Sequence, residues 1–326
     1  MTGQDQGARE PHKDAKKIGG TAYFAGGCFW GLERYFQGVT GVTSTQVGYA
    51  QSSVENPSYE QVCSGYTDAV ETVRVDFDPD VVSLRVLALL FMDVIDPYAR
   101  NRQGNDIGRQ YRSGMYFTDP QQHEVYATVL SEFREKTRRP AAVEVVALAS
   151  FYEAEDYHQD YLEKNPGGYC HIPFSKIGDV AHRQKYIERI WNLDPVEYDV
   201  TQKAGTEAPF HNKYDDEYAP GIYVDIVSGE PLFVSSTKYD AGCGWPSFSK
   251  PLDTAKLQYV QDLRVPGHPR IEVRTKESGI HLGHVFDDGP AELGGQRYCM
   301  NSASLRFVPR DEMEAEGYGK YLDQVE

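Results

Sequence analysis

Cysteine is scarce in this sequence. Five cysteines occur among 326 residues, which is too few for a domain held together by disulfide bonds. None belongs to a CxxC pair, so the spacing does not predict a zinc site built from paired cysteines. A cysteine with a special role is therefore expected to have a chemical function. The five are Cys28, Cys63, Cys170, Cys243 and Cys299.

Positive charge is also in short supply, because 33 lysine and arginine residues stand against 49 aspartate and glutamate residues. The formal net charge of -16 disfavours binding to the phosphate backbone of nucleic acids and to anionic membranes, which an acidic surface repels. We therefore expect neutral or peptidic substrates, and neither a nucleic-acid nor a membrane partner.

No apolar run is long enough to cross a bilayer. The longest, residues 81–95, is interrupted by Ser83, Arg85 and Asp93 and predicts a helix of the core. Residues 1–19 are polar and contain no apolar stretch of the kind that secretory signals have. They predict a polar N-terminal segment and a cytoplasmic protein, or an exported one if a leader has been removed.

The length favours two domains, because single cores rarely grow beyond about 250–300 residues. Residues 20–192 alternate between β-like and helical patterns, which predicts an α/β domain with a mixed sheet and flanking helices. The expected strands cover 21–25, 71–76, 114–118 and 143–149, and the expected helices cover 29–37, 83–95 and 120–138.

The polar segment 193–202 is predicted to be a linker. Beyond it, residues 203–326 contain short runs rich in β-branched and aromatic residues, such as 221–227, separated by glycine and proline. This pattern predicts a second domain of mostly antiparallel strands in barrel-like sheets.

The stretch GGCFWGLERYF, residues 26–36, places Cys28 where a strand turns into a helix. The unpaired N–H groups and the positive end of a helix favour a thiolate, and such sites can lower a cysteine pKa from about 8.5 to roughly 3.5–7.5. A packed core cysteine is an equally good interpretation of this turn taken alone. The turn by itself leaves both roles open.

Two further segments favour a nucleophile over a packed core cysteine at Cys28. Together with GGCFW, the segments QGNDIGRQYRS (103–113) and NPGGYC (165–170) resemble the A-type peptide methionine sulfoxide reductases, with matching order and spacing over residues 20–190. The resemblance implies that Cys28 is a nucleophile and Cys170 its resolving cysteine. It also implies that Phe29 and Trp30 form an apolar wall around the methyl group of the substrate.

The same resemblance implies a set of polar groups around the sulfoxide oxygen. Glu71 matches the acid of the family, Tyr59 and Tyr111 match its hydroxyl donors, and Asp106 matches a polar group that orders the site. The chemistry is consistent, because attack on a sulfoxide sulfur becomes easier as its oxygen is protonated. A carboxyl group in an aromatic pocket has its pKa raised, so it can hold that proton near neutral pH.

This chain departs from the family pattern at the two residues that commonly read Gly-His, which here are Asp68 and Ala69. This departure argues against a role for a histidine near Glu71, although not against Glu71 as the acid. His158 could orient a partner, although a surface or satisfied core histidine is the simpler interpretation. Cys63 is expected to be structural, because no acid or resolving partner is suggested for it.

A second set of motifs follows the predicted linker. The segments AGCGWPSF (241–248), HLGHVF (281–286) and RYCMN (297–301) resemble the B-type methionine sulfoxide reductases over about residues 203–310. The resemblance implies that Cys299 is a nucleophile, that Cys243 resolves it, and that Trp245 faces the substrate methyl group. The polar residues that match the family site are His281, His284, Asn301, Arg297 and Asp288.

Metal binding is not expected at either site. His281 and His284 form an HxxH pair, but no third ligand or carboxylate is apparent beside it. The two CxxC pairs that hold structural zinc in many B-type enzymes are absent, so we expect a zinc-free domain. The histidines could stabilise the thiolate of Cys299 and supply a proton, and Arg297 could equally be a structural salt-bridge residue.

These resemblances imply a bifunctional fusion that reduces S- and R-methionine sulfoxide in peptides, proteins and possibly the free amino acid. Each site would form a cysteine sulfenic acid and then a disulfide, which a thioredoxin-like dithiol protein would reduce, with no organic cofactor. We expect a monomer. Two other classes stay open: a cysteine hydrolase that uses Cys299 with a histidine base, and a redox-sensing or protein-binding module.

Overall fold

The computed structural model describes residues 20–325, so the polar segment predicted at 1–19 lies outside the described residues. The chain divides into two compact units, and the division falls after Ala181, inside helix α6 (Phe174–Asn192). The sequence predicts that the first domain ends at residue 192, which is later in the chain than this division. The two positions differ because the last turn of α6 places Ile190 in the core of the second unit. No helix among residues 20–325 is long and apolar enough to cross a membrane.

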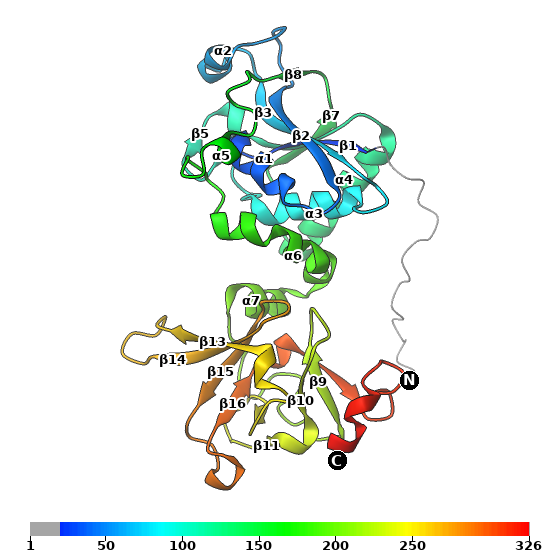
Figure 1. Cartoon of the computed structure of the whole chain (residues 1–326), viewed down its shortest axis with the longest axis vertical. Helices are drawn as coiled ribbons and strands as arrows, with labels where there is room; N and C mark the ends of the chain where they lie inside the picture. Colours follow the sequence, from blue (N-terminus) through cyan, green and yellow to red (C-terminus); the bar gives the residue numbers. More distant parts are fainter. Residues whose placement is uncertain (1–19, 326) are drawn as a thin grey trace. The chain divides into compact units, whose positions relative to one another are not determined.

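The N-terminal domain is built on one mixed sheet (Figure 1), as predicted. Its strand order is β7-β6-β1-β3-β2-β8, in which β6 and β7 are parallel and the other neighbours are antiparallel. The strands are β1 (Thr21–Ala25), β2 (Val42–Ala50), β3 (Val70–Phe77), β6 (Ser113–Phe117), β7 (Val143–Ala147) and β8 (Phe151–Glu153). A separate two-stranded ladder joins β4 (Arg102–Gln103) and β5 (Asp106–Ile107).

Helices pack around this sheet, and their starts follow the expected capping rules. The side chain of Ser83 accepts a hydrogen bond from the Val86 N–H at the start of α3, and Asp119 caps α4 with Pro120 in its first turn. The helices of this domain are α1 (Phe29–Gln37), α2 (Tyr59–Ser64), α3 (Leu84–Val94), α4 (Pro120–Thr137), α5 (Tyr161–Lys164) and the 3₁₀ helix η1 (Arg109–Tyr111).

The C-terminal domain consists of two antiparallel sheets, as predicted, with strand orders β10-β9-β17 and β11-β12-β16-β15-β14-β13. Its core is rich in aromatic side chains, including Tyr223, Phe233 and Phe248. The strands are β9 (Gly221–Asp225), β10 (Pro231–Val234), β11 (Lys238–Tyr239), β12 (Ser247–Phe248), β13 (Leu257–Asp262), β14 (Arg270–Thr275), β15 (His281–Phe286), β16 (Arg297–Met300) and β17 (Leu305–Pro309). The 3₁₀ helices are η2 (Ser235–Thr237), η3 (Thr254–Lys256), η4 (Ala291–Leu293), η5 (Ser302–Ser304) and η6 (Gly319–Gln324).

The segment predicted as a linker is mostly helical instead. Helix α7 covers Pro195–Lys203, and the side chain of Asp194 caps it in a reciprocal capping box with Glu197. Leu193 belongs to the core of the second domain, and Val200 is buried. The sequence does contain a signal for this helix, because Asp194 and Pro195 are followed by a glutamate three residues after the cap. The prediction of a linker relied on the polar composition of the segment and overlooked this signal.

A β-bulge interrupts the pairing of β14 with β15. Val273 pairs with Gly283, but the next residue, Arg274, pairs with His281, so Leu282 is the extra residue of β15. Residues three apart on a regular strand point to opposite faces. The bulge shifts this alternation, and the rings of His281 and His284 lie 5.5 Å apart between centroids.

Candidate functional sites

Cys28 lies at the turn between β1 and α1. It is the residue before the first turn of α1, its own side chain makes no capping hydrogen bond, and the residue is 7% exposed. Gly27 before it has φ +84, a left-handed conformation that glycine adopts without strain. The turn thus presents the thiol at the helix start, in the position that the sequence predicted.

Glu71 lies beside this turn although it is far away in the sequence. It is on β3, it is 2% exposed, and its Oε2 accepts a hydrogen bond of 3.0 Å from the backbone N–H of Phe29. The pKa of Glu71 is raised to about 8, because the effects of burial and of nearby Asp106 outweigh the lowering effect of the Phe29 N–H. The raised carboxyl pKa expected from the sequence is confirmed, so Glu71 carries a proton near neutral pH.

The pKa of Cys28 differs from the expectation. Burial raises the pKa of the Cys28 thiol above its ordinary value, and the charges of Glu71 and Asp106 raise it as well. The backbone N–H of Trp30 lowers the pKa, which is the helix-start effect foreseen from the sequence, but it does not offset burial. In this structure Cys28 is therefore a thiol rather than a thiolate.

Phe29 and Trp30 extend from the turn into an aromatic cluster. Phe29 is 1% exposed and its ring lies 5.9 Å from that of Tyr49, measured between centroids. Trp30 stacks on Tyr161 at 3.8 Å and donates a hydrogen bond of 3.1 Å from Nε1 to Nδ1 of His158. His158 is 1% exposed, so it is a buried histidine that orients Trp30. Sequence reasoning weighed that role for His158 and did not favour it.

Tyr59, Tyr111 and Asp106 are all close enough to Glu71 to interact with it electrostatically. Burial raises the pKa of both tyrosines, and the charge of Glu71 contributes to both shifts. Asp106 also raises the pKa of Tyr111. These hydroxyl groups therefore stay protonated and can donate hydrogen bonds across the normal pH range. Cys63 is exposed and next to Tyr59, and burial raises its thiol pKa, which gives it no sign of special reactivity.

Cys170 lies against the first turn of α1. A Cβ atom added at Gly31 would come within 2.7 Å of the Cys170 Sγ, so this sulfur packs where a side chain at residue 31 would be. Cys28 and Cys170 are both free thiols, and Cys170 contributes to the raised pKa of Cys28. The structure thus brings together two cysteines that are far apart in the sequence.

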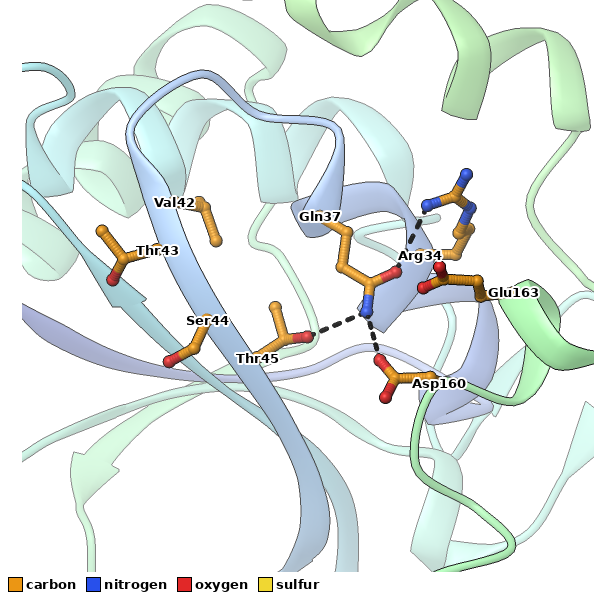
Figure 2. Close-up of a pocket in the computed structure, with 8 residues that line it drawn as sticks. All are labelled: Arg34, Gln37, Val42, Thr43, Ser44, Thr45, Asp160 and Glu163. Carbon is orange, nitrogen blue, oxygen red and sulfur yellow. Dashed lines mark hydrogen bonds between the residues drawn. The ribbon is translucent and has the colours of Figure 1, made fainter.

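A polar pocket of about 430 Å³ lies at the other end of α1 (Figure 2). In it, the amide of Gln37 donates to Thr45 at 3.1 Å and to Asp160 at 2.8 Å. No cysteine, histidine or tyrosine lines this pocket, so it contains no thiol that could attack a sulfoxide and is not the candidate active site. The lining residues are Arg34, Gln37, Val42, Thr43, Ser44, Thr45, Asp160 and Glu163.

In the second domain, Cys243 and Cys299 are already close, with their Sγ atoms 3.8 Å apart. Cys299 is on β16, and Cys243 lies in the loop before β12, where Ser247 contacts its sulfur at 3.4 Å. A cavity of about 90 Å³ opens beside Cys299 but is not lined by Cys243. Its lining residues are Thr206, Trp245, Arg270, Gly283, His284, Phe286, Cys299, Met300 and Asn301. A substrate in this cavity would meet Cys299.

The two histidines of HLGHVF each have a carboxylate partner that sequence reasoning missed. Nδ1 of His281 contacts Glu272, and Nε2 of His284 lies 2.8 Å from Oδ2 of Asp262. Burial lowers the pKa of His281 to about 4 and also lowers the pKa of His284. Both rings are therefore neutral at neutral pH. Within residues 20–325, no three histidine, cysteine or acidic side chains are grouped so that they could hold a metal ion.

Asn301 holds the bulge of β15 in place. Its backbone N–H and its side-chain Nδ2 both donate to the carbonyl of Leu282, at 2.8 and 3.0 Å. Its Oδ1 accepts from the N–H of Glu207, whose carbonyl accepts the Trp245 indole N–H at 3.1 Å. Glu207, which sequence reasoning did not single out, therefore connects Trp245 to Asn301.

Arg297 is a positive charge that acts on both thiols of the second domain. It makes two hydrogen bonds of 2.8 Å with Asp288, and its guanidinium lies 4.4 Å from the centre of the Phe286 ring. Burial and Cys243 raise the pKa of Cys299 to about 12, while Arg297 and a hydrogen bond with Ser247 lower it. Arg297 is thus a cation that acts on Cys299, whereas the two histidines are neutral and add no positive charge there.

Comparison with known proteins gives a family match for each half of the chain. Residues 20–190 match the family model described as peptide methionine sulfoxide reductase, and residues 193–309 match the SelR domain. Two solved structures are similar to part of the chain. One is Mxr1 from Saccharomyces cerevisiae in reduced form, with 35% identity over 46% of this chain and 87% of that chain and a TM-score of 0.44. The other is methionine sulfoxide reductase A of Corynebacterium diphtheriae, with 37% identity over 47% of this chain and 82% of that chain and a TM-score of 0.43.

The first family model covers more than half of the chain, and the second accounts for most of the remainder. The chain belongs to the peptide methionine sulfoxide reductase family, and it fuses an A-type domain that reduces the S epimer of methionine sulfoxide to a B-type domain that reduces the R epimer.

Proposed function

We propose that Cys28 attacks the sulfoxide sulfur in the N-terminal domain while Glu71 delivers a proton to the sulfoxide oxygen. The observation that carries this proposal is the buried carboxyl of Glu71, held by the Phe29 N–H next to the thiol and protonated near neutral pH. Tyr59 and Tyr111 donate hydrogen bonds to the same oxygen. Their raised pKa values keep both hydroxyl groups protonated.

In this mechanism Phe29 and Trp30 hold the methyl group of the substrate. His158 and Tyr161 fix the Trp30 ring, one by a hydrogen bond and the other by stacking, so the apolar wall is formed before substrate arrives. A preorganised wall of this kind places the sulfur in a defined position relative to the Cys28 thiol.

The reaction is balanced without any cofactor. A cysteine thiol and a sulfoxide give methionine and a cysteine sulfenic acid, because the sulfoxide oxygen moves to the cysteine sulfur and the thiol proton is retained overall. The thiol of Cys170 then attacks the sulfenic sulfur of Cys28, and a disulfide and one water molecule are formed. The contact of Cys170 with the first turn of α1 supports this pairing.

In the C-terminal domain we propose that Cys299 attacks and Cys243 resolves. Cys299 lines the cavity while Cys243 does not, and the two sulfur atoms are only 3.8 Å apart. Trp245 bounds the same cavity and faces the methyl group. Arg297 stabilises negative charge on Cys299, in agreement with its lowering effect on the pKa of that thiol. This close cysteine pair also argues against a cysteine hydrolase, because acyl transfer has no use for the second thiol.

The polar residues around this cavity have separate roles in the proposal. His284 lines the cavity with its Nε2–H donated to Asp262, so it can donate to the sulfoxide oxygen from Nδ1 only after it binds a second proton, while His281 lies beside it on the same face. Asn301 maintains the bulge that brings both rings together. Asp288 orients Arg297 through its paired hydrogen bonds.

The disulfides require an external reductant, and a thioredoxin-like dithiol protein would reduce them by thiol–disulfide exchange. Oxidised peptides and proteins are the proposed substrates, with the free amino acid as a further one. The zinc-free state, the monomeric state and the cytoplasmic location stay predictions.

Epimer-resolved turnover tests the two-site proposal. We expect Cys28→Ser to abolish reduction of the S epimer and to leave reduction of the R epimer near its normal rate, and Cys299→Ser to do the reverse. Cys170→Ser and Cys243→Ser should each still form one methionine per site in their own domain but should fail to turn over with thioredoxin. Loss of both activities after a single nucleophile change would refute the separation into two sites.

A further inference from the structure

Three buried polar atoms without a hydrogen-bond partner lie together beside the turn that carries Cys28. They are both ring nitrogens of His171 and Oδ2 of Asp106. The side chains are 4% and 14% exposed, and Nδ1 of His171 lies 3.7 Å from this Asp106 oxygen. Burying polar atoms without partners costs free energy, so such a group usually serves a function.

The ring of His171 reaches from one side of the Cys28 turn to the other. Its Nε2 lies 3.0 Å from the position that a Cβ at Gly27 would occupy. Its Nδ1 lies 3.6 Å from the corresponding position at Gly31, where the Sγ of Cys170 is also in contact. One nitrogen therefore faces the side of Cys170, and the other faces the backbone next to Cys28.

This placement matches the proton transfers of disulfide formation. We propose that His171 is a catalytic residue of the second step, in which its Nδ1 accepts the thiol proton of Cys170 and its Nε2–H protonates the hydroxyl that leaves the Cys28 sulfenic acid. The sulfur of Cys170 bonds to the sulfur of Cys28, the S–O bond breaks, and water is released. The ring ends in its other tautomer, and exchange with solvent restores the first.

The surroundings of the ring favour this role. Burial lowers the pKa of His171 below its ordinary value, while Asp106 and the carbonyl of Gly26 raise it, so the ring is neutral at neutral pH and has a free lone pair. The ionisable group that acts on the ring is Asp106 on β5; the thiol of Cys170 packs at the same Gly31 position, and Tyr169 and Cys28 interact with Asp106 and Cys170. Each tautomer has an acceptor beside it, because the carbonyl of Gly26 favours the ring proton before the transfer and Asp106 faces the newly protonated Nδ1 after it. The inference rests on the proposed roles of Cys28 and Cys170.

The pH dependence of the unmodified full chain gives a first test. After one turnover with the S epimer, the rate of Cys28–Cys170 disulfide formation is followed by acid quenching, alkylation of free thiols and mass spectrometry. Because burial raises the pKa of Cys170, an unassisted thiol would react about tenfold faster per pH unit between pH 7 and pH 9. A neutral histidine base instead gives a rate that is flat over this range and falls only at a pH lower than the ordinary histidine pKa of about 6.5, because burial lowers the pKa of His171. A steady rise from pH 7 to pH 9 would overturn the proposal.

Substitution gives the second test. In His171→Gln we expect methionine formation in the first turnover within about twofold of the unmodified protein, and disulfide formation slowed by roughly 10²-fold at pH 7 and rising with pH. His123→Gln changes an exposed histidine on α4 of the same domain and should alter neither step. Equal slowing of both steps in His171→Gln would show a structural role, and an unchanged disulfide step would show no role.

The two proposals fail differently. If Cys170→Ser still recycled with thioredoxin, the assignment of Cys170 would be wrong, and with it the basis for His171. If the Cys28–Cys170 disulfide formed normally in His171→Gln, only the role of His171 would be wrong.

Discussion

Replacing Glu71 by glutamine should make the N-terminal domain both slower and more stable. Glutamine keeps the shape and can accept the Phe29 N–H, but it cannot deliver a proton to the sulfoxide oxygen. Removal of one positioned acid typically costs on the order of 10²–10⁴ in rate. We expect a loss of this size in the first turnover of the S epimer at pH 7, where about nine-tenths of the normal Glu71 side chains carry the proton.

The stability gain follows from the pKa of about 8, which is raised above that of an unfolded glutamate. The folded domain therefore binds this proton more tightly than the unfolded chain does. That contribution to stability is complete below about pH 4.3 and is lost as the pH rises towards 8, where Glu71 ionises. Compared with a side chain that is neutral in both the folded and the unfolded protein, Glu71 lowers the free energy of unfolding by about 3 kcal/mol at pH 7. Glu71→Gln should restore this amount.

Glu33→Gln is a matched control for this experiment. Glu33 is also buried in the N-terminal domain, at 1% exposure on α1, and burial with the charge of Asp160 raises its pKa to about 7. The Glu33→Gln protein should gain stability at neutral pH and should reduce the S epimer at the normal rate. Rapid-quench kinetics with the S epimer and denaturant unfolding between pH 5 and pH 8 measure both effects on the full chain. A Glu71→Gln protein with normal single-turnover rates, or with no gain in stability that grows with pH, would refute the reasoning.

The remaining predictions concern recycling, the second thiol and metals. Gly31→Ala should leave the first turnover with the S epimer near normal but slow disulfide formation by about tenfold or more, because the new methyl group would lie 2.7 Å from the Cys170 sulfur. Thiol alkylation after one turnover measures this, and rapid disulfide formation would contradict the contact. Arg297→Gln should raise the pKa of Cys299, which the pH dependence of iodoacetamide labelling reports, and should slow reduction of the R epimer by about tenfold at pH 7. Treatment with EDTA should not change reduction of the R epimer, and a loss that zinc restores would mean that His281 or its neighbours bind a metal.

Local sequence patterns predicted the elements that carry the first site. The strand at 21–25 and the helix at 29–37 are both observed, because a short apolar run, a double glycine and a helical pattern follow one another directly. The strand expected at 71–76 is present as β3 and carries Glu71. These features depend on neighbouring residues, so they can be read without knowledge of the rest of the chain.

Contacts between distant segments could not be predicted in this way. The contact of Cys170 with Gly31 depends on how the loop after α5 returns to α1. The raised pKa of Cys28 depends on its depth in the folded domain and on the Glu71 charge, both of which outweigh the helix start. The same holds for His171, whose position next to the Cys28 turn leaves no signal in the sequence around it.

The bulge at Leu282 makes the second site depend on how one strand is paired. His281 and His284 share one face because a single additional residue interrupts the regular alternation of β15, and Asn301 binds the displaced carbonyl. If the same four residues were paired without a bulge, no reactive side chain would be lost, yet one histidine would turn to the opposite face of the sheet. A relative that keeps both cysteines, both histidines and the arginine but cannot hold the bulge would therefore look complete in an alignment and still lack a working site. For this half of the enzyme, the pairing of the strand is as much a part of the catalytic signature as the identity of its residues.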